Sequence, residues 1–140
     1  MIFDVRLLPV LIAAVAHFFL GMLWYSPVLF GKPWMKAVGM TEEKMKQVSG
    51  SDMGIRMVVA LITGFIMAFV ISYIFHLVGV ATVREGLRGG FILWLGFVLP
   101  LQTSPVLWEG RGMNYWMINA SYWLVSMLVM STILVVLPLR

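Results

Sequence analysis

The sequence contains no cysteine and few charged residues. Among its 140 residues, 10 are Lys or Arg and 6 are Asp or Glu, so charged residues make up 11% of the chain. Without cysteine the chain has no disulfide, no thiolate metal site and no cysteine nucleophile. Soluble domains carry about 25% charged residues, so this chain lacks the polar surface that would keep a folded domain in water.

Apolar residues dominate in place of charge. They make up 61% of the chain, and the mean hydropathy is +0.97. At about 20 residues per span, the length predicts one all-α domain over 1–140, an integral membrane four-helix transmembrane bundle. We expect spans at about 7–25, 55–78, 87–107 and 115–137. The segment 28–54 is predicted to be interfacial and soluble, with a short interfacial helix after the first span.

An aromatic corner ends the first span. Trp24 and Tyr25 precede Ser26-Pro27. The residue before a proline is disfavoured in a helix, so the span should end here. Tryptophan and tyrosine favour the headgroup level of a membrane, which places this corner at the interface.

The short interfacial helix is predicted from the residues that follow. Pro33 is suited to open a helix and Gly39 to close one. Trp34 and the lysines Lys32 and Lys36 would hold that helix in the interfacial plane.

Two further helix starts carry capping signals. Thr41 is a candidate N-cap, and Thr82 with Glu85 matches a capping box. Ser51 or Asp52 is expected to cap the second span.

The second span has small residues at every fourth position: Ala60, Gly64, Ala68 and Ser72. Small side chains let two helix backbones approach closely in a membrane. The pattern predicts a helix-packing face, which would serve within the bundle or between copies of the chain.

The third span holds two prolines around a polar triplet. Pro100 and Pro105 enclose Gln102, Thr103 and Ser104. Proline removes a backbone hydrogen bond that neighbours must replace, so we expect an interrupted helix. Broken spans often line binding sites, and a simple bend is the alternative.

The fourth span has one polar face. Tyr115, Asn119, Tyr122 and Ser126 follow at i, i+4, i+7 and i+11. At about 1.5 Å per residue, His17 of the first span lies near the membrane midplane, at the depth of Ser126. His17 is either a functional intramembrane group or a neutral imidazole hydrogen-bonded to Ser126.

A polar layer is expected at the first-loop end of the bundle. Its members are Trp24, Tyr25, Ser26, Gln102, Thr103, Tyr115 and Asn119. The layer would form either a shallow ligand pocket or an interhelical hydrogen-bond network.

We predict no catalytic residue, cofactor or metal site. His17 and His76 should differ in depth by roughly 10 Å, and no cysteine or buried acid completes a metal shell. Nucleic acid is not expected as a partner, because interfacial Lys and Arg facing lipid phosphates account for the net charge of +4.

The basic residues favour a cytoplasmic first loop. Six lie on the first-loop side: Lys32, Lys36, Lys44, Lys46, Arg56 and Arg111. Four lie on the terminal side: Arg6, Arg84, Arg88 and Arg140. Cytoplasmic loops carry an excess of Lys and Arg. Membrane lipids are the expected partners, a homo-oligomer is an open alternative, and no protein partner is identified.

Several motifs resemble one known family. They are Gly21-Met22-Leu23-Trp24-Tyr25-Ser26-Pro27, Leu29-Phe30-Gly31-Lys32, Trp34-Met35, Trp94-Leu95-Gly96-Phe97, Glu109-Gly110 and Ile118-Asn119-Ala120-Ser121-Tyr122. The chain is similar in these motifs to the bacterial membrane family catalogued as domain of unknown function 1761. The resemblance implies a small four-span protein of the inner membrane and implies no activity.

Three function hypotheses follow. The first is non-enzymatic binding of a lipid, an amphiphile or a partner at the Trp24-Tyr25 corner. The second is an oligomeric transporter or channel subunit that uses His17 and the interrupted third span. The third is an intramembrane enzyme with His17 as base, for which the sequence offers no nucleophile.

Overall fold

The structure is a computed structural model that describes residues 5–137. In chain order, its helices are α1 (Leu7–Trp24), α2 (Gly31–Val38), α3 (Glu42–Lys46), α4 (Gly50–Val78), α5 (Val83–Leu93), the π-helical segment η1 (Trp94–Val98), α6 (Leu99–Trp108) and α7 (Met113–Val136). Since α5, η1 and α6 follow without a gap, four helices are long and apolar enough to cross a membrane. The predicted all-α, four-helix architecture is confirmed.

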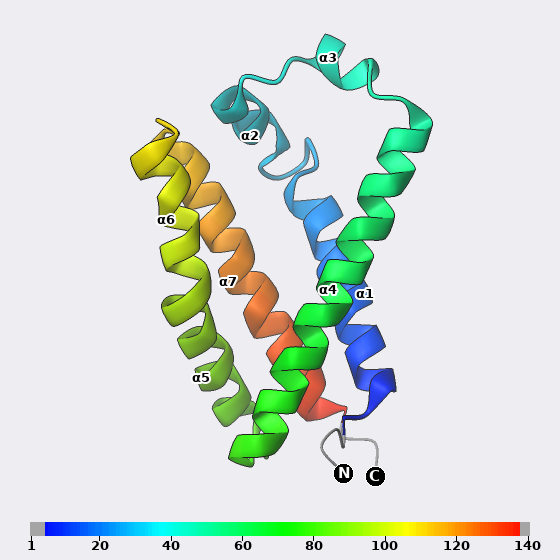
Figure 1. Cartoon of the computed structure of the whole chain (residues 1–140), viewed down its shortest axis with the longest axis vertical. Helices are drawn as coiled ribbons and strands as arrows, with labels where there is room; N and C mark the ends of the chain where they lie inside the picture. Colours follow the sequence, from blue (N-terminus) through cyan, green and yellow to red (C-terminus); the bar gives the residue numbers. More distant parts are fainter. Residues whose placement is uncertain (1–4, 138–140) are drawn as a thin grey trace.

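The helix α7 is the centre of the bundle. It packs against both α1 and α5, whereas α4 packs mainly against α1 (Figure 1). Towards the end of the bundle where α3 lies, α4 leans away from the other helices, and α2 and α3 bridge the opening from α1 to α4 (Figure 1). The start of α1 and the end of α7 lie together at the opposite end (Figure 1).

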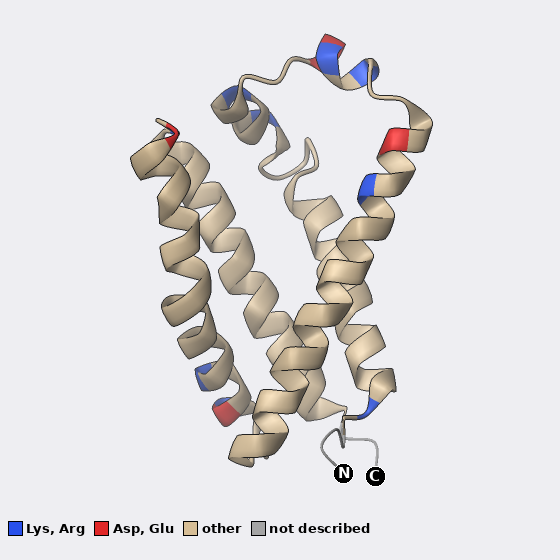
Figure 2. Ribbon diagram, in the orientation of Figure 1, with Lys and Arg blue, Asp and Glu red and all other residues tan. Residues whose placement is uncertain are grey.

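Charged residues lie at the two ends of the bundle. Figure 2 shows Lys, Arg, Asp and Glu in α2, α3, the first turns of α4 and the two ends of the third span, with an uncharged band between them. The 18 residues of α1 extend about 27 Å, close to the thickness of a bilayer's hydrocarbon core of about 30 Å. The thickness of the uncharged band therefore matches that of the hydrocarbon core of a membrane. Arg140, one of the residues on which the orientation prediction depends, lies outside the described residues.

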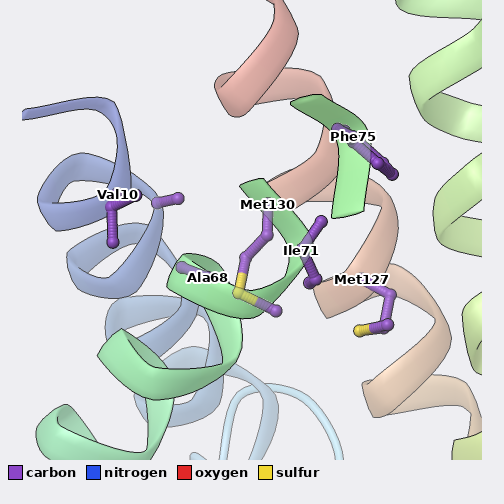
Figure 3. Packing of buried hydrophobic residues seen from close by; sticks show 7 residues of the cluster. Val10, Ala68, Ile71, Phe75, Met127 and Met130 are labelled. Atoms are coloured by element: carbon purple, nitrogen blue, oxygen red, sulfur yellow. The ribbon is translucent and has the colours of Figure 1, made fainter. Parts of the chain in front are cut away.

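The main apolar core lies in the half of the bundle nearer the termini. Its buried residues are Val10, Ala13, Ala68, Ile71, Phe75, Met127 and Met130. In Figure 3, Met130 reaches from α7 towards Ala68 of α4. The unbranched methionine side chain adapts to irregular gaps, which lets it fill the space where α1, α4 and α7 meet.

Two glycines bring α5 directly onto α7. A Cβ at Gly86 would lie 2.7 Å from Val135 Cγ2, and a Cβ at Gly90 would overlap Ser131 Oγ and lie 3.1 Å from the Met127 carbonyl oxygen. The spacing of four residues is the small-residue pattern of close membrane-helix pairs. We did not predict this face from the sequence, although Gly86 and Gly90 carry its signal.

The small-residue face of α4 meets α1 over part of its length. Gly64 and Ala68 are buried, Ser72 is half-buried, and Ala60 is exposed. A Cβ at Gly64 would lie 2.7 Å from Cδ2 of His17. The exposed Ala60 belongs to the first half of α4, and towards its first turn α4 leans away from the other helices (Figure 1).

Two of the predicted helix N-caps are confirmed, and the third of these helices is capped by another residue. The Thr41 hydroxyl accepts a hydrogen bond from the Lys44 amide, and Thr82 and Glu85 form the reciprocal capping box. The second span begins earlier than expected, because the cap is Ser49 in place of Ser51 or Asp52.

The third span is not interrupted at its polar triplet, contrary to our expectation. Helical structure continues through Pro100 and Pro105. The irregularity lies one turn earlier, where the Leu99 amide donates to the Trp94 carbonyl in the π-helical segment η1. A proline ring clashes with the carbonyl four residues before it, here that of Gly96, and the wider π turn relieves such a clash.

Candidate functional site

A polar seam joins α1 to α7. It consists of His17 and Tyr25 from α1 and its C-cap with Asn119, Tyr122 and Ser126 of α7, so the polar face of the fourth span points at α1. His17 Nδ1 is hydrogen-bonded to Ser126 Oγ, and the Tyr122 hydroxyl lies 3.4 Å from the same nitrogen. The Tyr25 hydroxyl donates to Asn119 Oδ1 at 2.6 Å. Asn119 in turn donates to the Tyr115 carbonyl oxygen at 3.0 Å.

His17 is enclosed on three sides. Its ring stacks on Trp123 with centroids 5.4 Å apart, and the backbone of Gly64 covers its Cδ2 edge. Ser126, its hydrogen-bond partner, is fully buried. Buried polar groups in a bundle need such partners, so His17 helps to hold α1, α4 and α7 together.

The aromatic corner is turned towards the bundle. Trp24 Nε1 donates to the Ile118 carbonyl oxygen at 3.2 Å, and the Trp24 ring lies against Phe30 with centroids 4.8 Å apart. Tyr25 makes an edge contact with Trp34 at 5.5 Å. Trp24 and Tyr25 therefore bond the end of α1 to α7. They also contact the rings of the residues that follow, Phe30 and Trp34.

The backbone of the corner folds back tightly onto itself. The Ser26 carbonyl accepts from the amides of Leu29 and Gly31, at 3.1 and 2.9 Å. A Cβ at Gly31 would lie 2.5 Å from the Tyr25 carbonyl oxygen and 2.6 Å from that of Ser26. Only glycine fits at this position, and the tight corner directs α2 back onto α7.

The other members of the expected polar layer are dispersed. Thr103 accepts from Trp116 Nε1 at 3.2 Å and so ties α6 to α7. Tyr115 lies under the Arg111 guanidinium, with 5.4 Å between Cζ and the ring centroid. Gln102 is half-buried on α6, and its side chain takes part in no hydrogen bond among the described residues. The structure therefore does not bring these residues together into one pocket.

An open groove of about 670 Å³ lies between α2, η1 and α7, and we call it the α2–α7 groove. One wall consists of Phe30, Pro33 and Trp94. The other is one face of α7, formed by Asn114, Trp116, Met117, Ile118, Ala120, Ser121 and Leu124.

The polar atoms of the groove walls are mostly bonded within the protein. Trp94 Nε1 donates to the Ala120 carbonyl oxygen at 2.9 Å, and Trp116 Nε1 donates to Thr103 Oγ1. The Ser121 hydroxyl donates to the Met117 carbonyl oxygen at 2.5 Å. The indole rings therefore present carbon to the groove, which is suited to an alkyl chain.

From the sequence we placed the ligand surface at Trp24 and Tyr25 and did not identify Phe30, Trp94 or Trp116 as groove residues. The sequence signals were the presence of Phe30 in the Leu29-Phe30-Gly31-Lys32 motif and of Trp94 in the Trp94-Leu95-Gly96-Phe97 motif. The groove depends on where α2 folds back, which no local pattern encodes.

The described part of the chain contains no cluster of metal-binding side chains. Among residues 5–137, no three His, Asp or Glu side chains lie close enough together to bind one ion.

The whole bundle matches one family model. Residues 8–135 match the family described as "Protein of unknown function (DUF1761)". The chain belongs to the DUF1761 family. The matched region extends from the first turn of α1 to the last turn of α7, so the DUF1761 match includes both walls of the α2–α7 groove. No curated protein and no solved structure matches this DUF1761 chain.

Proposed function

We propose that this protein is non-enzymatic and binds the alkyl chain of a membrane amphiphile in the α2–α7 groove. The observation that carries the proposal is the groove itself, about 670 Å³ in volume and lined by the rings of Phe30, Trp94 and Trp116. Ligand sites of this size are mostly apolar with a few polar groups. Asn114 and Ser121 are the polar side chains here, and both lie on α7.

The shape of the groove favours a chain over a compact ligand. Its α7 wall runs from Asn114 to Leu124, a length of about 15 Å along the helix. Asn114 lies in the first turn of α7, at the first-loop end of the bundle. A ligand with its polar end at this level would extend its alkyl chain towards the middle of the membrane.

The polar seam supports a structural role better than a transport role. His17, Tyr122 and Ser126 bond to one another, and Tyr25 bonds to Asn119. These groups hold α1 on α7 and leave few polar atoms free for a transported solute. The proposal therefore places the ligand on the other face of α7, in the α2–α7 groove.

Filling the groove tests the proposal. In cells that carry phospholipids with photoreactive alkyl chains, we expect labelling to concentrate on residues 113–124 of the wild-type protein. Ser121 lies half-buried in the groove wall, so Ser121→Phe should lower this labelling at least about fivefold, the effect of losing about 1 kcal/mol of chain contact. Labelled peptides would be identified by mass spectrometry.

A matched control separates the groove from ordinary lipid contact. Ile66→Phe places the same ring on an exposed part of α4 that is outside the groove, and it should leave the labelling of residues 113–124 unchanged. Equal labelling of these residues in wild type and Ser121→Phe would refute the proposal.

We further propose that the protein lies in a bacterial inner membrane with α2 and α3 on the cytoplasmic side. This side of the bundle carries more Lys and Arg than the other, and such an excess is typical of cytoplasmic loops. The absence of cysteine permits a direct test. In spheroplasts, Glu43→Cys in α3 should resist an impermeant maleimide until the membrane is opened, whereas Ala81→Cys before α5 should react at once. The reverse pattern would show the opposite orientation.

A further inference from the structure

The helix α2 carries positive charge beside the groove. Lys32 and Lys36 are exposed, and α2 has no acidic residue in its sequence. Among the described residues, an ion pair joins Arg111 to Glu109 at 3.8 Å, and neither lysine of α2 takes part in one. Both ammonium groups are therefore available to a ligand.

The two lysines lie on one face of α2, next to the groove. They are four residues apart, and residues at this spacing share a helix face. Pro33, which lines the groove, directly follows Lys32 and precedes Lys36 by three residues. Like charges at this spacing destabilise a helix, and an anion between them would remove that repulsion.

We infer that the amphiphile is an anionic phospholipid, with one chain in the α2–α7 groove and its phosphate held between Lys32 and Lys36. This inference rests on the proposed function and adds the headgroup chemistry. Exposed lysines extend their ammonium groups to the headgroup level. A zwitterionic lipid carries its own ammonium group, which the lysine pair repels, so charge complementarity selects the anionic lipid.

The inference is tested by letting an anionic and a zwitterionic phospholipid compete for binding to the full-length protein. We would place the protein in nanodiscs of equal phosphatidylglycerol and phosphatidylethanolamine and identify the retained lipid by native mass spectrometry. Each lysine near a headgroup is worth about a fivefold preference for an anionic lipid. The wild type should retain phosphatidylglycerol at least about tenfold over phosphatidylethanolamine. In the double variant Lys32→Gln/Lys36→Gln this preference should fall to about twofold or less.

Two controls isolate the position of the charge. Lys44→Gln/Arg56→Gln removes two positive charges from the same side, on α3 and α4, and should keep the preference. Lys32→Arg/Lys36→Arg should also keep it, because the charge remains.

The outcomes separate this inference from the proposed function. Retained lipid without anionic preference, or a preference that survives Lys32→Gln/Lys36→Gln, would overturn the headgroup assignment and leave the groove proposal standing. No retained lipid in any variant would overturn both.

Discussion

Gly31→Ala should unfold the corner between α1 and α2. The new Cβ would lie 2.5 to 2.7 Å from backbone atoms of Tyr25 and Ser26, which no side-chain rotation can relieve. Forcing extra volume into a packed site costs about 1–3 kcal/mol, and we expect about 3 kcal/mol here because the obstructing atoms are backbone. The free energy of unfolding would be measured by SDS titration in mixed micelles, followed by helical ellipticity.

The control for this change is another glycine of the chain. Gly54 lies in α4, and a Cβ added there would have nothing within 4 Å, so Gly54→Ala should be neutral or stabilising by about 0.5 kcal/mol. Gly31→Ala should also abolish lipid labelling of the groove, since the corner positions α2 against α7. A Gly31→Ala protein as stable as wild type would show that the corner is not packed as described.

Gly90→Leu should separate α5 from α7. Even a Cβ alone at Gly90 would lie too close to Ser131 Oγ and the Met127 carbonyl oxygen, and leucine adds three more carbon atoms. We expect a loss of about 3 kcal/mol or more in the same titration. Gly96→Leu in the same span is the control, because a Cβ at Gly96 has nothing within 4 Å. Equal stability of the two variants would contradict the close packing of α5 on α7.

A double-mutant cycle identifies the partner of Gly90. The side chain of Ser131 is the nearest obstacle, and its hydroxyl is fully buried without a hydrogen-bond partner among the described residues. Gly90→Ala should therefore cost less in a Ser131→Gly background, with a coupling of about 1 kcal/mol. Strict additivity would mean that α5 meets α7 elsewhere.

The helices and the polar face of α7 could be predicted because local patterns encode them. Apolar length defines the spans, and the side chains of Thr41 and Thr82 do cap their helices. The spacing of Asn119, Tyr122 and Ser126 predicted that these side chains share one face. The similar depth of His17 and Ser126 in the membrane predicted that the two are hydrogen-bonded, and the structure contains this bond.

The groove and the π-helical segment could not be predicted, for physical reasons. The π turn depends on the strain that Pro100 places on a carbonyl one turn earlier, whereas from the sequence we expected the prolines to act at the polar triplet itself. The groove forms because Gly31 lets the chain reverse and bring Phe30 and Pro33 towards α7. Such contacts between distant segments have no periodic signature, so the sequence predicted a ligand surface at Trp24 and Tyr25, whose side chains bond to α7 in the structure.

Native mass spectrometry of the protein, extracted gently from the membrane in which it is made, tests directly whether a lipid occupies the α2–α7 groove. We predict that the wild-type protein carries one added mass equal to that of an anionic phospholipid, and that Ser121→Phe, extracted in the same way, does not. A wild-type protein that carries no lipid, or a Ser121→Phe protein that keeps the same lipid, would contradict the account of the α2–α7 groove.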